Sequence, residues 1–581
     1  MGTIKTLAKS IREYKKPAII TPILMVVEVA MEVFLPLIIS WFGMCIESGD
    51  AMGMINYGVL MVVVAIISLL AGMLGGKFCA EASTGFAKNL RKDMYENVQK
   101  FSFSNIDKFS SSSLVTRLTT DVTNVQMSFM MIIRTAIRSP LMLIFSIIMS
   151  FSINSVLPAV FCVTIPILAF AIIMIIKNAM PIFKRVFKRY DALNESIQEN
   201  VKGMRVVKSY VREDFETQKV EKVSDELCKD FTRAERILAF NGPVMTFCLQ
   251  GGLIAIALLG SRLILNGASG LSVFSLQSML TYSLQILISL QMLSMIFVMI
   301  TLSSESAKRI EEVLLEKSDL ANRENFITSV KDGSVSFKNV SFKYSKTGER
   351  NVLDNVSVDI KSGETVGIIG GTGSSKSTFV SLISRLYDVT EGSVEVGGID
   401  VRNYDMTILR DQVSVVLQKN LLFSGTIKEN MRWGNENATD EEIVNACKIA
   451  QAHEFISSFP NGYDTFIEQG GANVSGGQKQ RLCIARAILK KPKILILDDS
   501  TSAVDMKTDA LLRKAFREDL PNTTKIIIAQ RISSIQDADK IIVLDGGKIN
   551  AVGTHNELIK NNEIYKEVYY SQNKNTDGGE A

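Results

Sequence analysis

Residues 365–378 read TVGIIGGTGSSKST, and this stretch decides the fold of the second half of the chain. The apolar run Thr365–Ile369 predicts a buried strand, a glycine-rich loop follows it, and a helix is expected to begin near Ser377. Backbone amides of such a loop and of a helix N-terminus bind phosphate, Lys376 can neutralise phosphate charge, and the Ser377 hydroxyl can bind Mg²⁺. The stretch therefore predicts a phosphate loop in an α/β domain that binds a nucleotide.

The whole loop belongs to this expected nucleotide site. Its members are Gly370, Gly371, Thr372, Gly373, Ser374, Ser375, Lys376, Ser377 and Thr378. Ser375 departs from the usual pattern, which has glycine before the lysine. Because glycine tolerates backbone conformations that a side chain disfavours, we expect a small backbone strain at Ser375.

The first half of the chain has the composition of a membrane protein. The 581 residues are 47% hydrophobic, their mean hydropathy is +0.20, and the apolar excess lies in the first half. Six apolar stretches each have the roughly 20 residues that a helix needs to cross a bilayer. These stretches are 18–46, 55–76, 128–152, 155–176, 240–264 and 273–302.

Lysine and arginine residues predict the orientation of these six spans. They are frequent before the first span and in the segments 77–127 and 177–239, whereas the expected outer connections near 47–54, 152–155 and 265–272 contain none. Cytoplasmic loops carry such an excess of positive charge. We therefore expect a multi-pass protein of the cell (plasma) membrane, with its N-terminus and its second half in the cytoplasm.

The character of the sequence changes after about residue 315, where a polar segment precedes short β-rich runs. The expected division is a transmembrane domain over 1–315, a linker over 316–332, an α/β domain over 333–572 and a disordered tail over 573–581. Within the first domain, the helical pattern loosens at 103–109 and at 203–209. Short coupling helices are expected there, and ordinary hairpin tips in solvent are the alternative.

Charge and cysteine content exclude other classes of protein. The net charge of +4 reflects the distribution expected of membrane loops, so it gives no indication of nucleic-acid binding. Seven cysteines without a CxxC spacing predict free thiols rather than a disulfide framework or a zinc site.

Further motifs of the second half follow in a fixed order. They are Tyr344, Gln418, residues 474–478 (VSGGQ), Asp498 and residues 502–505 (SAVD). Together with the phosphate loop, this set resembles that of a half-size ABC exporter of the multidrug type, over nearly the whole chain. The resemblance implies an all-α transmembrane domain of six helices, followed by an α/β P-loop ABC ATPase domain with a helical subdomain.

The resemblance also implies a role for each motif, with ATP and Mg²⁺ as cofactors. Tyr344 would stack on adenine, and the ligands of Mg²⁺ would be Ser377, Gln418 and Asp498. The γ-phosphate of ATP held by the opposite subunit would be capped by Ser475, Gly476, Gly477 and Gln478. The alternatives are a strand-edge tyrosine, a surface glutamine and a serine that only caps its own helix.

Two positions depart from the family pattern. Asp499 follows Asp498 where the family has glutamate, and Gln530 stands where the family has histidine. Aspartate is one methylene shorter than glutamate, and a misplacement of about 1 Å can slow a reaction about 10²-fold. An amide cannot exchange protons near neutral pH as an imidazole can. With Asp499, Gln530 and Gln418 as the catalytic residues, we expect this chain to bind ATP and to hydrolyse it slowly.

A slow site predicts a different partner chain. The expected partner is a second half-transporter that carries glutamate and histidine at the positions matching Asp499 and Gln530, so that a heterodimer has one fast and one slow site. A slower homodimer, in which Asp499 is the working base, is the alternative.

The expected activity is ATP-driven export of hydrophobic or amphipathic, drug-like compounds across the lipid bilayer. The alternatives are a homodimeric lipid or peptide exporter, an inward-moving transporter, and an ATP-binding membrane regulator or channel that does not pump.

Polar residues within the spans give hypotheses about the cargo. Glu28 and Glu32 lie one helical turn apart, so they could attract a cationic amphiphile or form hydrogen bonds between helices. Gln285, Ser289, Met292 and Met299 form a stripe that could line a permissive cavity, with helix packing as the alternative.

Overall fold

The computed structural model describes residues 2–266, 271–344, 350–500 and 504–573. The chain forms two compact units. The first comprises the residues up to Gln99 and Ser111–Glu316, and the second comprises Lys100–Ser110 and the residues from Lys317 onward. Segment 100–110 thus belongs to the second unit, although it stands between membrane helices in the sequence. The boundaries expected at residues 315 and 333 stay predictions, and all but the first residue of the expected tail lie outside the described residues.

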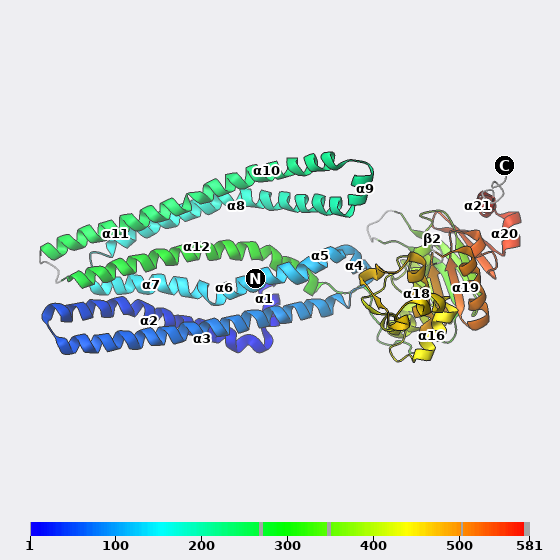
Figure 1. Ribbon diagram of the computed structural model, residues 1–581, viewed down its shortest axis with the longest axis horizontal. Helices are drawn as coiled ribbons and strands as arrows, with labels where there is room; N and C mark the ends of the chain where they lie inside the picture. The colour runs from blue at the N-terminus through cyan, green and yellow to red at the C-terminus, as the bar shows by residue number, and fades with distance from the viewer. Residues whose placement is uncertain (1, 267–270, 345–349, 501–503, 574–581) are drawn as a thin grey trace. The chain divides into compact units, whose positions relative to one another are not determined.

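Helices of very different length build the first unit (Figure 1). In chain order they are α1 Gly2–Ala8, η1 Lys9–Tyr14, α2 Lys15–Ser48, α3 Ala51–Val98, α5 Ser111–Thr116, η2 Arg117–Asp121, α6 Val122–Ile133, α7 Thr135–Ile153, α8 Ala159–Lys202, α9 Met204–Ser209, α10 Glu213–Ala239, α11 Asn241–Leu265 and α12 Val273–Leu315. Over the described residues, six stretches of helix are long and apolar enough to cross a membrane. The prediction of six spanning helices is confirmed.

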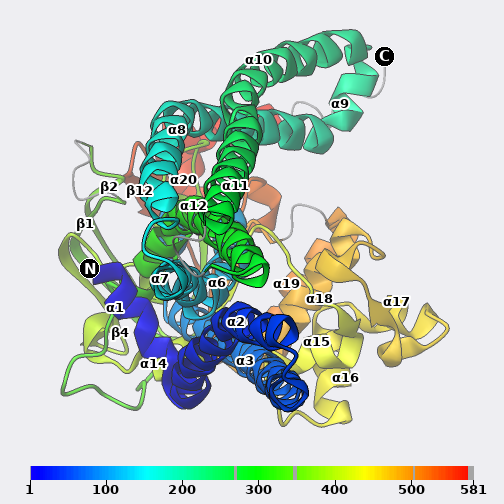
Figure 2. The same cartoon turned by 90° about the vertical axis from the view of Figure 1, so that its left-hand side faces the viewer.

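The longest of these helices exceed the thickness of a membrane's hydrocarbon core. Helix α3 has 48 residues, which at 1.5 Å per residue is about 72 Å, whereas the hydrocarbon core of a bilayer measures about 30 Å. Seen end-on in Figure 2, α2 lies beside α3, and α7 lies beside α12. The first unit therefore continues as helices well beyond the lipid.

The connection between α2 and α3 takes only two residues. Gly49 ends α2 in the left-handed conformation, with φ of +73°, which glycine adopts without steric cost. The Asp50 carboxylate then accepts a hydrogen bond of 3.0 Å from the Gly53 amide and caps the start of α3. A glycine followed by an N-capping residue is thus enough to reverse the chain here.

A six-stranded sheet forms the centre of the second unit, in the order β12-β11-β3-β10-β9-β6. The strands are β3 Thr365–Ile369, β6 Val413–Val416, β9 Ile494–Asp498, β10 Thr524–Ile528, β11 Lys540–Asp545 and β12 Lys548–Gly553. From β11 to β6 all neighbours are parallel, and β12 joins the edge antiparallel. The carboxyl ends of β3, β10, β9 and β6 therefore lie next to one another, which is where α/β sheets bind ligands.

Two antiparallel sheets and a set of helices complete the unit. One sheet has the order β2-β1-β4-β5, and the other pairs β7 with β8. The bounds are β1 Val335–Phe342, β2 Leu353–Ile360, β4 Glu391–Val396, β5 Ile399–Asp400, β7 Gly425–Thr426 and β8 Phe466–Ile467. The helices are α13 Lys376–Ile383, η3 Val401–Asn403, α14 Met406–Gln412, α15 Ile427–Arg432, α16 Asp440–Ile449, α17 His453–Ser458, η4 Gly462–Asp464, η5 Gln469–Gly471, α18 Gly476–Leu489, α19 Met506–Asp519, η6 Ile532–Ser534, α20 His555–Asn561 and α21 Glu563–Asn573.

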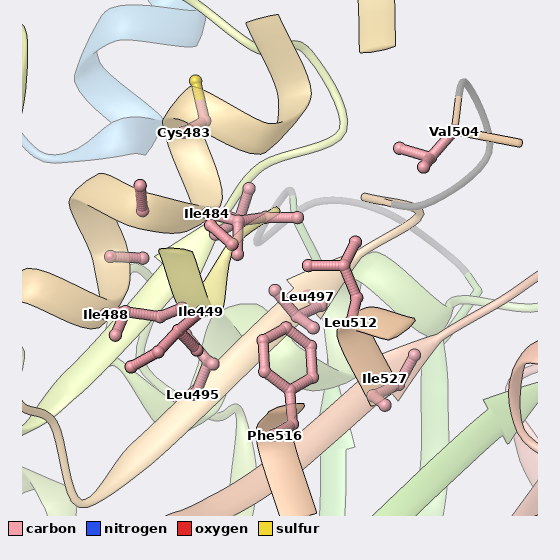
Figure 3. Close-up of a cluster of buried hydrophobic side chains, with 14 of the residues drawn as sticks. Ile449, Cys483, Ile484, Ile488, Leu495, Leu497, Val504, Leu512, Phe516 and Ile527 are labelled. Atoms are coloured by element: carbon pink, nitrogen blue, oxygen red, sulfur yellow. The ribbon is translucent and has the colours of Figure 1, made fainter. Parts of the chain in front are cut away.

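A buried apolar cluster joins the helical segment to the central sheet (Figure 3). Ile484 of α18 and Leu495 and Leu497 of β9 are fully buried, and Ile449 of α16 and Phe516 of α19 belong to the same cluster. Burying one such side chain contributes about 1.5–3 kcal/mol. The cluster thus fixes α18 against the strand that ends at Asp498.

Short helices lie at both positions where coupling helices are expected. Helix α4, Phe103–Phe109, belongs to the second unit and begins with a capping box between Ser102 and Asn105. The Tyr387 hydroxyl donates a hydrogen bond of 2.9 Å to Asp107 Oδ2. Helix α9 belongs to the first unit and buries none of its residues. A coupling role for α4 and α9 stays a prediction.

Candidate nucleotide site

The parallel sheet brings together predicted site residues that are far apart in the sequence. The phosphate loop follows β3, and Gln418 lies two residues after β6. Asp498 ends β9, Asp499 comes directly after it, and Gln530 lies two residues after β10. Because these four strands are parallel neighbours, their carboxyl ends form one edge. The roles of these residues stay predictions, and the contacts described next limit what each residue can do.

Lys376 closes the phosphate loop. Its Nζ donates hydrogen bonds of 2.8 Å to the carbonyl oxygens of Gly370 and of Gly371, and one of 3.3 Å to Ser374 Oγ. Burial lowers the pKa of the Lys376 ammonium, and the nearby carboxylates of Asp498 and Asp499 oppose that shift. The ammonium is held inside the loop, where phosphate oxygens could replace the carbonyl groups as its partners.

The strain expected at Ser375 appears as a left-handed backbone. Ser375 precedes α13 with φ of +73° and ψ of 23°, a conformation that costs a residue with a side chain roughly 1–2 kcal/mol. Its hydroxyl donates a hydrogen bond of 2.7 Å to the Val352 carbonyl oxygen. This bond offsets part of the cost that glycine would avoid.

Ser377 and Asp498 form the core of the expected metal site. Ser377 Oγ donates a hydrogen bond of 3.1 Å to Asp498 Oδ1. Burial raises the pKa of the Asp498 carboxyl, the neighbouring charge of Asp499 raises it further, and the contacts with Ser377 and Lys376 oppose the shift. A hydroxyl and a buried carboxylate are oxygen ligands of the kind that Mg²⁺ prefers, so the residues present fit this ion.

Asp499 meets both of the other residues expected to be catalytic. Its Oδ2 accepts a hydrogen bond of 2.7 Å from Gln530 Nε2 and a longer one of 3.4 Å from Gln418 Nε2. Its backbone has φ of +50°, which aspartate tolerates better than most residues. The residue as a whole is 9% exposed to solvent. Two amide groups thus hold one carboxylate oxygen of Asp499.

Two glutamines that no local sequence pattern indicates support this arrangement. Gln480 of α18 is buried, and its Nε2 donates a hydrogen bond of 3.3 Å to the backbone oxygen of Asp499. Gln572 of α21 donates one of 2.8 Å to the Gln530 backbone oxygen and accepts one of 2.9 Å from the Ile532 amide. Both contacts join distant parts of the chain, so no local pattern could have indicated them.

Tyr344 follows β1 and lies close to α13. Its hydroxyl is 2.9 Å from Thr378 Oγ1, and its ring contacts Phe342 and Tyr387 edge-on. The residue is 52% exposed, so one part of the ring surface remains accessible for stacking. The hydroxyl contact ties this aromatic residue to the helix that begins at the phosphate loop.

The predicted signature motif caps a helix in this structure. The Gln478 amide donates a hydrogen bond of 3.3 Å to Ser475 Oγ, and the Ser475 amide donates one of 2.9 Å to Gln478 Oε1. This reciprocal pair is a capping box at the start of α18, whose first residues are Gly476 and Gly477. Part of the predicted linking loop, Ser502 and Ala503, lies outside the described residues.

Polar residues of the membrane helices contact residues of neighbouring helices. Arg138 Nη2 of α7 lies 2.7 Å from Glu32 Oε2 and 3.7 Å from Glu28 Oε1, both of α2. Gln285 of α12 accepts a hydrogen bond of 3.1 Å from Ser146 Oγ. The two glutamates thus form interhelical ion pairs, as one of the two hypotheses expects.

Comparison with known proteins identifies both halves of the chain. Residues 18–299 match the family described as ABC transporter transmembrane region, and residues 353–502 match the family described as ABC transporter. The chain is 38% identical over 566 residues to YfiB of Bacillus subtilis, an uncharacterized ABC transporter ATP-binding protein, with 97% of each chain covered. It is 39% identical over 381 residues to YgaD of the same organism, provisionally named a multidrug export ATP-binding/permease protein, with 65% of each chain covered.

The fold also matches a solved structure. A bacterial Atm1-family ABC exporter with ATP bound superposes with a TM-score of 0.81 at 23% identity, covering 96% of this chain and 98% of the other. The chain therefore belongs to the ABC transporters, as a half-size transporter with an exporter-type fold.

Proposed function

We propose that this chain is the slow-site subunit of a heterodimeric exporter, which uses ATP to move hydrophobic or amphipathic compounds outward across the cell membrane. The ATPase domain lies in the cytoplasm, and a different half-transporter supplies the second ATP site. Similarity to YgaD supports export of drug-like compounds. The distribution of positive charge along the chain supports the orientation.

The contact between Gln530 and Asp499 carries the proposal. In the hydrolysis reaction, a water oxygen bonds to the γ-phosphorus, the bond to the ADP oxygen breaks, and the water loses a proton. A general base must lie within hydrogen-bond reach of that water. Asp499 Oδ2 already accepts hydrogen bonds from Gln530 and Gln418. Aspartate is one methylene shorter than glutamate, so its carboxylate would reach less far toward a bound γ-phosphate.

The other residues retain their functions in nucleotide binding. Lys376 can neutralise phosphate charge, and the loop amides can bind the phosphate oxygens. Ser377 and Asp498 would hold Mg²⁺, which would bring phosphate oxygens into position and neutralise charge. ATP at this site would bind and remain, while the intact Ser475–Gln478 motif would complete the partner's site.

The test is ATP hydrolysis by the purified full-length chain, alone and with a co-expressed partner. We expect activity only in the pair, and its loss when the partner's catalytic glutamate is changed to glutamine. The Lys376→Ala variant is the control, since it removes nucleotide binding from this chain's own loop. Rapid hydrolysis by the chain alone would instead establish Asp499 as a competent base in a homodimer.

A further inference from the structure

A cavity lies among the membrane helices of the first unit. Its volume is about 370 Å³, within the range of small-molecule sites. Helices α2, α6, α7 and α12 line it, and four of the lining residues are methionines: Met130, Met131, Met142 and Met292. Methionine side chains are flexible and polarisable, so they adapt to apolar bodies of different shape.

One arginine, Arg138, faces two carboxylates at this cavity. Glu32 lines the cavity, but Arg138 Nη2 lies 2.7 Å from its carboxylate and 3.7 Å from that of Glu28. The side chain of Glu28 is only 12% exposed. A cationic ligand would have to displace Arg138 from these carboxylates in a medium of low dielectric constant, where separating an ion pair is costly.

Arg134 is the charged lining residue that forms no ion pair with a described residue. It lies at the break between α6 and α7, one turn before Arg138, and lines the same cavity. No described residue accepts a hydrogen bond from its guanidinium. At Gly76 of α3, an added Cβ would lie 3.9 Å from Arg134 Nη1, so no side chain from that position competes for the group.

We propose that this cavity binds amphiphiles with one anionic group, such as a carboxylate, sulfonate or phosphate, which pairs with Arg134. The inference rests on the proposed export of amphipathic compounds and names their class. Guanidinium binds such groups through two parallel hydrogen bonds. A charged group within a membrane is costly unless it is paired, so an anionic headgroup gives Arg134 the partner that the described residues do not. The apolar body lies along the methionines.

Two matched photoreactive probes test the preference for charge. Both carry a dodecyl chain with a diazirine, and one has a sulfonate headgroup while the other has a trimethylammonium headgroup. The full-length chain is placed in phosphatidylcholine nanodiscs without ATP, and labelling of peptides that contain Met130 or Met292 is measured against competing unlabelled compound. We expect the sulfonate probe to bind more tightly. Tighter binding of the trimethylammonium probe would overturn the proposal.

Variants locate the headgroup. Arg134→Gln should weaken binding of the sulfonate probe about tenfold to hundredfold, and Arg134→Lys should retain part of it. Arg262→Gln, at an exposed arginine near the end of α11, changes the net charge equally and should have no effect. Glu32→Gln should strengthen sulfonate binding because it partly releases Arg138. Unchanged sulfonate binding in Arg134→Gln would contradict the inference, and retained ATP binding would show that the variant is folded.

Two further experiments are needed. The first distinguishes lipid headgroups from free amphiphiles as the source of the anion, and the second distinguishes failure of the proposed function from failure of the proposed anion site. Added phosphatidylglycerol should compete with the sulfonate probe if lipid headgroups are the ligands, and should not if the ligands are free amphiphiles. Probe binding does not require hydrolysis. Failure of ATP-driven transport with intact sulfonate binding would therefore contradict only the proposed function. A different result would contradict only the cavity's proposed specificity. In that result the chain binds no anionic probe, it transports neutral or cationic cargo, and Arg134→Gln leaves this transport unchanged.

Discussion

Asp498 and Asp499 are consecutive residues with different surroundings. Asp498 faces the Ser377 hydroxyl and the Lys376 ammonium, whereas Asp499 faces the amides of Gln530 and Gln418. The positive φ of Asp499 turns the chain at this point, so that the two carboxylates point to different partners. One residue is thus suited to a cation, and the other to hydrogen-bond donors.

Asp498→Asn should stabilise the chain without nucleotide. Burial raises the pKa of Asp498 above its ordinary value, so ionisation is less favourable in the folded than in the unfolded protein. The destabilisation is absent below the ordinary pKa, grows as pH rises above it, and is complete above the raised pKa. The variant should therefore have a higher Tm at neutral pH, and the difference should shrink on acidification. Thermal unfolding of the full chain between pH 4 and 8 checks this.

The same variant should lose the advantage that Mg²⁺ gives to ATP binding, because asparagine is a weaker ligand. A decrease of about tenfold or more in Mg²⁺-dependent affinity is expected, whereas ATP binding in EDTA should change little. Equal affinity of both proteins in Mg²⁺ would exclude Asp498 as a ligand of the ion.

The double variant Asp499→Glu, Gln530→His should speed hydrolysis at the site that we propose to be slow. Glutamate restores the missing methylene and histidine restores a group that titrates near neutral pH. With the partner's own site inactivated, we expect turnover to rise about tenfold to hundredfold. Asp499→Glu alone should gain less, since a left-handed backbone costs glutamate more than aspartate and Gln530 would still hold the carboxylate. No increase in the double variant would contradict the proposal that these two residues limit hydrolysis.

Among the helices and strands, the start of α13 depends on the backbone conformation and the hydroxyl group of Ser375. Ser375→Ala keeps the Cβ atom, which strains the left-handed backbone, but loses the hydrogen bond from the serine hydroxyl to Val352. It should lower the free energy of unfolding by about 1 kcal/mol. Ser375→Gly loses the bond and the strain together and should be nearly neutral. Denaturant unfolding of both variants separates the two effects, and equal losses would mean that the hydroxyl, not the backbone, dominates.

An ion pair between the buried Asp121 and the partly exposed Arg309 joins the π-helical turn η2 to α12. Asp121 is 1% exposed, and it accepts hydrogen bonds from Arg309, through Nε and Nη2, and from Ser306 Oγ. Asp121→Asn should cost about 2–3 kcal/mol of stability, since it leaves the arginine with weaker acceptors. Glu96→Gln, which removes an exposed pair with Lys92, should stay within about 0.5 kcal/mol. Equal effects of the two variants on thermal unfolding would contradict this.

Local patterns in the sequence predict much of the fold, whereas contacts between distant residues cannot be predicted from them. The six apolar stretches and the strand–loop–helix pattern at 365–378 depend on neighbouring residues, so hydropathy and glycine spacing predicted them. The partner of Glu28 and Glu32 is Arg138, more than a hundred positions away, and Gln572 supports Gln530 from the last described helix. Periodicity says nothing about such pairs, because they depend on how helices pack.

At the scale of the whole molecule, α4 has a further consequence. Asp107 accepts a hydrogen bond from Tyr387, which is 280 residues later in the chain. At about 5–20 residues per second, a ribosome makes Tyr387 roughly 15–60 s after Asp107. During that interval the spanning helices enter the membrane while α4 waits without its partner. The ATPase unit can therefore mature only after the membrane half has been made, and a truncated product would display α4 uncovered to the quality-control proteases of the cell.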